Sequence, residues 1–302
     1  MDEEALEKQR LAGKVARQAL EHGLRLIKEG QSLLEVAEKT EQVILDKGTL
    51  PAFPANISID SVAAHFTPRH DDGELVFTKG SLVKLDVGVH VDGYLADNAS
   101  TVEVGTRNWT DLIRAADEAV ATAVEVIRPG VPMSMVGAAI ERTIRSYGFK
   151  PIENLTGHSL RRYTLHADKS VPNVGNLRGE KSKHVVEAGD SYAIEPFSTT
   201  GAGRVVGKKT SNIYRIVDYK ESGIEGADGL LRKIEADFRT LPFSERWCYK
   251  LDERAPYHLQ KLMRKGIVMG YPILAEAANG MVAQSEDTVV VTEDGCEVTT
   301  VL

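Results

Sequence analysis

Two aspartates, Asp86 and Asp97, lie in the segment KLDVGVHVDGYLADNAS (84–100), where they could bind divalent metal ions. Apolar and β-branched residues flank Asp92-Gly93, a favoured two-residue turn between antiparallel strands. The pattern predicts a β-hairpin in which Asp86 and Asp97 share one face, with Cβ atoms roughly 7–8 Å apart or somewhat less. Carboxylates at that separation can hold two ions roughly 3.5–4 Å apart, a geometry common in hydrolases.

The predicted turn fixes the pairing of the two strands. The facing pairs are Val91 with Tyr94, Gly88 with Asp97, and Asp86 with Ala99. Gly88 is expected to leave space for the ions. The alternative is a pair of solvated aspartates on an edge strand. It is disfavoured because both strands are otherwise hydrophobic, and an unpaired charge on the inner face would be unfavourable.

A weak internal repeat indicates how such a hairpin is supported. IKEGQSLLEVAEKTEQVILDKG (27–48) aligns with IRPGVPMSMVGAAIERTIRSYG (127–148) at an offset of 100 residues. The coincident residues are Ile27/Ile127, Gly30/Gly130, Val36/Val136, Glu41/Glu141, Ile44/Ile144 and Gly48/Gly148. Each copy predicts an amphipathic helix, a glycine stop, a second helix and a C-capping glycine, followed by strands. Chance similarity of helical patterns is the alternative, and the paired glycines disfavour it. We expect two α/β halves related by a pseudo-twofold axis.

Five longer stretches resemble the methionine aminopeptidases, in particular their type II branch. They are AFPANISIDSVAAHFTP (52–68), KLDVGVHVDGYLAD (84–97), LTGHSLRRYTLHA (155–167), AIEPFSTTGAG (193–203) and MVAQSEDTVVV (281–291). The stretches follow the order of the family and span most of the chain.

The resemblance implies an α/β (α+β) pita-bread fold and a dinuclear metal site between its halves. By resemblance the metal ligands are Asp86, Asp97, His158, Glu195 and Glu286, with Glu195 also a catalytic proton shuttle. Four carboxylates and one imidazole suit two divalent ions of Co, Mn, Fe(II) or Zn, with little discrimination between them. By spacing alone, His158 could equally be a surface residue in an irregular segment.

The resemblance also implies substrate-binding residues. His65 and His166 would be catalytic, one contacting the scissile amide and the other the carbonyl oxygen or oxyanion. Without the resemblance each would be a core histidine. The residues implied to line an apolar pocket for a thioether side chain are Phe53, Pro54, Leu165, Phe197 and Tyr271.

Other residues near these motifs are given weaker roles. His90 is expected to be structural, while four more histidines are expected to be solvated: His22, His70, His184 and His258. Asn98 departs from the family, which commonly has threonine after the second aspartate, but it could still hydrogen-bond a ligand carboxylate.

The interval between Glu195 and Glu286 is longer than the repeat needs. Residues 228–239 and 255–266 are expected to be helical and 266–274 extended. A small helical, winged-helix-like insertion at 199–282 would separate type II from type I. The catalytic domain is then 1–198 plus 283–302, with halves about 1–105 and 109–198/283–302. The alternative is a DNA-binding helix-turn-helix. It is disfavoured because residues 228–266 have nine Lys or Arg against six Asp or Glu, and this small excess of positive charge is too weak to attract a polyanion.

Composition excludes several classes of function. A net charge of −7 argues against a dedicated nucleic-acid binder, which would need a basic face. Two cysteines, Cys248 and Cys296, are too few for a disulfide framework. The sequence leaves a single bridge between them open, and the reducing cytoplasm is the simpler interpretation. The charged N-terminus lacks an export signal, and no stretch is apolar enough for a membrane span.

The expected function is removal of the initiator methionine ahead of a small second residue. The implied partners are peptides with N-terminal methionine and nascent chains, with ribosome association left open and a monomer expected. One alternative is an Xaa-Pro-cleaving pita-bread peptidase, which we expect to have an extra N-terminal domain. Another is a non-catalytic binding protein on this fold, whose mark would be loss of the ligands.

Overall fold

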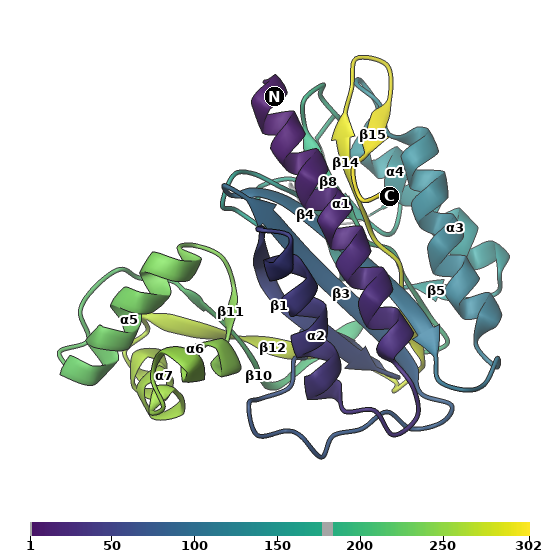
Figure 1. Ribbon diagram of the computed structural model, residues 1–302. Helices are drawn as coiled ribbons and strands as arrows, with labels where there is room; N and C mark the ends of the chain where they lie inside the picture. The colour runs from purple at the N-terminus through teal and green to yellow at the C-terminus, as the bar shows by residue number, and fades with distance from the viewer. Residues whose placement is uncertain (1, 177–183) are drawn as a thin grey trace.

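The computed structural model describes residues 2–176 and 184–302 (Figure 1). Its helices are α1 (Glu3–Leu26), α2 (Leu33–Asp46), α3 (Thr110–Val126), α4 (Met133–Ser146), α5 (Glu225–Phe238), α6 (Glu245–Leu251) and α7 (Ala255–Arg264). The strands of the first part of the chain are β1 (Leu50–Ile59), β2 (Val62–Ala64), β3 (Leu82–Val91), β4 (Tyr94–Glu103), β5 (Lys150–Pro151), β6 (Thr156–Ser159) and β7 (Ser170–Pro172). The remaining strands are β8 (Ser191–Ile194), β9 (Phe197–Thr199), β10 (Val205–Ile216), β11 (Phe243–Ser244), β12 (Val268–Glu276), β13 (Val282–Gln284), β14 (Asp287–Val291) and β15 (Cys296–Val298).

The two helix pairs predicted from the repeat are present as α1–α2 and α3–α4. Gly48 and Gly148 follow the second helix of each pair with φ of 71° and 82°, a left-handed conformation that favours glycine. Gly30 and Gly130 do not cap the first helices but lie in the loops that follow. Their N–H groups donate equivalently, Gly30 to the Phe77 carbonyl and Gly130 to that of Val186, each at 2.9 Å.

Each helix pair covers one sheet. The first sheet has the strand order β1-β3-β4, and the second has the order β15-β14-β8-β6-β7. Figure 1 shows α1 lying across β3 and β4. The helix buries Ala12, Ala16 and Ala19 at helical spacing, and these small residues let it pack closely on Leu85 and Val87 of β3.

The two sheets meet along β4 and β14. The N–H of Glu286 donates to the carbonyl of Ala99 at 2.9 Å, and the N–H of Ala99 returns a bond of 3.3 Å. The Thr288 hydroxyl bonds both backbone groups of Asp97, at 2.7 and 2.8 Å. This contact brings a late segment of the chain against the hairpin of the first half.

The segment between β9 and β13 forms a projection at one side of the molecule (Figure 1). Its sheet has the order β11-β10-β12-β2, so β2 of the first half joins it. Helices α5 and α7 and strand β12 occur where the sequence predicts them, within a few residues, whereas α6 was not predicted. The domain boundaries given above stay a prediction. Among the described helices, none combines the length and apolar character needed to cross a membrane.

Candidate metal centre

The hairpin of β3 and β4 has the predicted register. Gly88 pairs with Asp97 and Asp86 with Ala99. Both turn residues are left-handed, with φ of 50° at Asp92 and 86° at Gly93, as expected for a turn that matches strand twist. Asp86 and Asp97 therefore lie on the same face, and both line one pocket.

Gly88 has a different function from the one expected. A Cβ added at this position would overlap the aromatic ring of Phe53. The glycine therefore makes room for Phe53, which packs over the hairpin and lines the pocket. We expected Gly88 to leave space for the ions, whereas the structure shows that it leaves space for the Phe53 ring.

Three further side chains reach the pocket from the second sheet. His158 lies on β6, which pairs with β8, so the segment predicted to be irregular is a short strand. Glu195 directly follows β8, and Glu286 directly precedes β14. The backbone bonds between Glu286 and Ala99 place Glu286 beside the hairpin.

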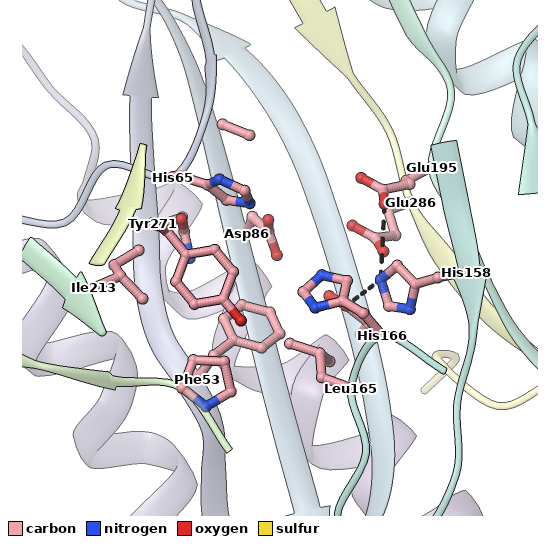
Figure 2. Close-up of a pocket in the computed structure, with 14 residues that line it drawn as sticks. Phe53, His65, Asp86, His158, Leu165, His166, Glu195, Ile213, Tyr271 and Glu286 are labelled. Atoms are coloured by element: carbon pink, nitrogen blue, oxygen red, sulfur yellow. Dashed lines mark ion pairs between the residues drawn. The ribbon is translucent and has the colours of Figure 1, made fainter. Parts of the chain in front are cut away.

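The five predicted ligands come together. His158 Nε2 lies 3.7 Å from Asp97 Oδ2 and 3.7 Å from Glu195 Oε1. One ligand atom each of Asp97, His158 and Glu286 falls within 4.8 Å of the others. Asp86 faces this group in the same pocket (Figure 2). Residues from both sheets thus form one cluster.

The electrostatics of the cluster favour a cation. Burial raises the pKa of Asp86 to about 7, and it also raises the pKa values of Asp97, Glu195 and Glu286. Repulsion between neighbouring carboxylates adds to the last three pKa shifts. Within the described chain, Asp86 Oδ1, Asp97 Oδ1 and Glu286 Oε1 are buried without a hydrogen-bond partner. Burial lowers the pKa of His158 to about 4, so its ring is neutral as ligation requires. The donor set fits a divalent cation.

The other two predicted catalytic residues line the same pocket. His65 follows β2 with φ of 64°, and its Nδ1 lies 3.2 Å from the carbonyl oxygen of Pro272. Its ring packs edge-on against Tyr271, with centroids 5.1 Å apart. The His166 ring lies 4.5 Å from that of His158 and 6.2 Å from that of Tyr271. In Figure 2, His65 and Tyr271 lie across the pocket from His158 and Glu195.

The apolar wall includes three of the five predicted residues. Phe53, Leu165 and Tyr271 line the pocket, whose empty volume including its mouth is about 460 Å³. Pro54 and Phe197 lie outside its lining. Phe197 lies on β9, which belongs to a different sheet from β8, and it is fully buried in a separate core cluster.

Four lining residues were not predicted: Asn56, Ala64, Ile213 and Pro242. Asn56 belongs to the same motif as Phe53, but strict alternation from Phe53 would place it on the opposite face. Ile213 and Pro242 come from β10 and the loop before β11. The side chains of isoleucine and proline carry no reactive or metal-binding group, so nothing in the sequence indicated these two residues as part of the site.

Comparisons with known proteins agree with this geometry. Residues 7–293 match the family model described as Metallopeptidase family M24. The chain is 44% identical over 300 residues to a methionine aminopeptidase of Archaeoglobus fulgidus, covering 99% of this chain and all of that protein. A methionine aminopeptidase of Pyrococcus horikoshii is 45% identical over 291 residues, covering 96% and 97%. This chain belongs to metallopeptidase family M24.

Solved structures of other proteins share the pita-bread fold of M24. The structure of a thermophilic Arx1 superposes with a TM-score of 0.87 at 18% identity, covering 99% of this chain and 91% of that one. Methionine aminopeptidase from Thermotoga maritima gives a TM-score of 0.72 at 24% identity, covering 99% and 98%. At such identities the likeness shows the fold alone. The predicted resemblance is confirmed by the family match and the curated relatives.

Residues around the M24 site support it in ways the sequence only partly predicts. His90 Nδ1 accepts a bond from the Gly93 N–H at 3.2 Å, consistent with a structural role. Asn98 Nδ2 donates to the backbone carbonyl of Glu286 at 2.5 Å and not to its carboxylate.

His258 was expected to be solvated and this is wrong. It is buried, with Nδ1 2.7 Å from Asp252 Oδ2, because α7 packs against α5 and α6 and the ring lies against Gly226 of α5.

Proposed function

We propose that this chain removes N-terminal methionine from peptides and nascent proteins, with a preference for a small second residue. The observation that carries the proposal is the cluster of four carboxylates and one imidazole beside an apolar pocket, in which Asp97, His158 and Glu286 are buried and Asp86 and Glu195 partly buried. Full-length relatives named methionine aminopeptidase, 44–45% identical, support the same activity. The chain is an M24 metallopeptidase, a hydrolase.

The five residues would hold two divalent ions of Co, Mn, Fe(II) or Zn. Asp86 and Asp97 would contribute ligands from the hairpin, and His158, Glu195 and Glu286 from the second sheet. When bound, such a pair lowers the pKa of water towards neutrality and polarises the scissile carbonyl. Glu195, which lines the pocket, would move the proton from the nucleophile to the leaving amine.

The two pocket histidines would act on the substrate and not hold metal. The carbonyl of Pro272 can only accept, so His65 Nδ1 carries the proton and Nε2 of the neutral ring is an acceptor. Burial lowers the pKa of His65, which favours that neutral form. His65 is then suited to accept from the scissile N–H. His166 would donate to the developing oxyanion.

The pocket wall supports selectivity for an unbranched apolar side chain. Phe53, Leu165 and Tyr271 offer ring and methyl surfaces to a thioether. A charged N-terminal side chain would be buried there without a partner, which is strongly unfavourable. A long second residue would collide with the rim around Tyr271.

The test compares kcat/KM for Met-Ala, Met-Leu, Lys-Ala and Xaa-Pro peptides on one metal. Met-Ala should lead by orders of magnitude. A preference for Xaa-Pro would assign the chain to the proline-specific peptidases of this fold. Absence of turnover on every peptide, with metal bound, would favour a non-catalytic binding protein.

The cellular setting follows from this activity. Nascent chains would be encountered in the cytoplasm by a monomeric enzyme, and association with the ribosome would bring it to them. The acidic net charge of −7 argues against a specific nucleic-acid partner. Sedimentation of the protein with and without ribosomes tests both the oligomeric state and the association.

A further inference from the structure

Strand β1 contains an irregularity beside the pocket. Phe53 pairs with Gly88 and Asn56 with Asp86, so three steps along β1 match two along β3. Residues three apart on a regular strand point to opposite faces, whereas the extra residue of a β-bulge re-aims the side chains that follow. Phe53 and Asn56 both line the pocket for this reason.

The backbone of the bulge is held by side chains. The N–H of Ala55 donates to Glu41 Oε1 at 2.9 Å. The carbonyl of Ala55 accepts from the Thr67 hydroxyl at 2.8 Å. Both polar groups of this buried residue are therefore satisfied from outside the β1–β3 ladder.

A buried ion pair connects these two side chains. Arg246 of α6, 1% exposed, donates through Nη1 to Glu41 Oε2 at 2.5 Å and through Nη2 to Glu41 Oε1. Nη2 also bonds the Thr67 hydroxyl at 3.1 Å. Trp247 Nε1 donates to Glu41 Oε2 at 2.9 Å. One arginine from the projecting segment thus contacts both residues that hold Ala55.

The repeat shows what is particular to this arrangement. Glu141, the counterpart of Glu41 at the offset of 100 residues, also accepts a backbone N–H, from Gly175 at 3.1 Å. Its other oxygen accepts from Arg145, one turn later on the same helix and exposed. The two glutamates share a structural function, but among the described contacts Glu41, and not Glu141, is bonded by the projecting segment, and Glu41 lies behind the pocket wall.

We propose that Glu41, Thr67 and Arg246 form a clamp that positions the β1 bulge and thereby the side chains of Phe53 and Asn56. The segment that contains α6 then sets the shape of the pocket from behind, in addition to lining it with Ile213 and Pro242. The three clamp residues are positioning residues and do not touch substrate. The inference rests on the proposed aminopeptidase activity.

Two variants loosen the clamp without removing its charges. Thr67→Val keeps the volume and the Glu41–Arg246 pair but releases the Ala55 carbonyl. Arg246→Lys keeps the positive charge but loses the planar fork that reaches both Glu41 and Thr67. Removing Arg246 altogether would leave Glu41 buried and unpaired, so unfolding would obscure the result. Glu141→Gln is the matched control in the other half.

The kinetic readout is selectivity among N-terminal side chains. For both clamp variants the preference for Met-Ala over Ile-Ala should fall about tenfold, since a misfit of one methylene in a pocket changes selectivity by about 10- to 200-fold. The loss should appear mainly in KM, with kcat and bound metal unchanged. Glu141→Gln should keep the wild-type preference.

A second readout needs no turnover. Hydrogen exchange of the peptide covering residues 50–59, measured on the metal-free proteins, should be faster in Thr67→Val and Arg246→Lys and unchanged in Glu141→Gln. If both variants kept wild-type selectivity and exchange while only the melting temperature fell, the clamp would be purely structural and the inference overturned. Wild-type protein inactive on Met-Ala would instead refute the proposed function.

Discussion

His65 combines an unusual backbone with a fixed ring. Its left-handed φ of 64° is unfavourable by about 1–2 kcal/mol for a residue other than glycine. The conformation persists because β2 is paired with β12 on one side and the ring bonds the Pro272 carbonyl on the other. Backbone strain at a pocket residue of this kind is typical of functional sites.

The first prediction concerns His65 and His166. Alanine at either position should lower kcat by about 10²–10³, the usual effect of removing one transition-state hydrogen bond. Metal content should remain that of the wild type. The measurements are steady-state rates on Met-Ala and elemental analysis of the purified variants. Loss of an ion in His166→Ala would move that residue into the metal site and contradict the assignment.

The second prediction concerns pH and His90. Burial lowers the pKa of His90 to about 4, whereas the unfolded chain titrates near 6.5. Between these values the unfolded state binds the additional proton, so stability present above pH 6.5 is lost as the pH falls towards 4. His90→Asn does not titrate there, and its amide oxygen can still accept from Gly93.

Urea unfolding of the metal-free proteins at pH 7, 5.5 and 4 measures this difference. The wild type should lose roughly 2–3 kcal/mol more than His90→Asn over that range, at about 1.4 kcal/mol for each unit of pKa difference. Parallel losses of stability would show that His90 does not contribute to acid sensitivity.

At the scale of the element, the turn of the hairpin links the metal site to the pocket loop. The N–H of Tyr163 donates to the Gly93 carbonyl at 2.8 Å, and the loop continues to Leu165 and His166. A Cβ at Gly93 would overlap the ring of Tyr163, and the left-handed φ of 86° disfavours any other residue. The turn therefore sets the position of the loop as well as that of the strands.

The third prediction compares two glycine-to-alanine variants. Gly30 has φ of 81° and open space around it, so Gly30→Ala should lose only about 1 kcal/mol of stability and keep full activity. Gly93→Ala should lose more stability and also lower kcat/KM, because the displaced Tyr163 moves the pocket loop. Chemical denaturation and peptide turnover measure the two effects. If both variants lost the same stability and activity, the clash of the new Cβ at Gly93 with Tyr163 would not contribute to the effect.

Local chemistry explains which elements the sequence could predict. Asp92-Gly93 between alternating apolar residues specifies a hairpin and its register within a few residues. Asn56 was missed because the bulge depends on Glu41 and Thr67, which are distant in sequence. Helix α6 has only seven residues, too few to show a period. The strand that carries His158 has four residues, so no pattern distinguishes it from a loop.

At the scale of the whole molecule, the site depends on contacts that no local pattern specifies. Ala99 and Glu286 pair although more than half of the sequence separates them, and neither segment indicates its partner. From the sequence, only the resemblance to a family predicts that Glu286 lies beside the hairpin. The charged cluster that results lies between the two helix-covered sheets and draws two residues from one and three from the other.

The fourth prediction is that divalent ions join these halves. Without them the buried carboxylates repel one another, so Asp97→Asn should stabilise the metal-free protein. In the wild type, Mn²⁺ at 100 times its dissociation constant should add about 2.7 kcal/mol for each independent site. Asp97→Ala and Glu286→Ala should lose most of that gain and all activity while remaining folded.

Asp92→Asn provides the control within the same hairpin. Asp92 is exposed at the turn, where its carboxylate pairs with Lys8 Nζ at 2.9 Å, and asparagine tolerates its left-handed backbone. This variant should bind Mn²⁺ and gain stability as the wild type does. Thermal denaturation with and without Mn²⁺, together with calorimetric titration, distinguishes the variants. If Asp97→Ala and Glu286→Ala kept the wild-type stabilisation and turnover, a dinuclear site between the halves would be refuted. Retention of one ion with no activity would instead show that the second ion is required for catalysis.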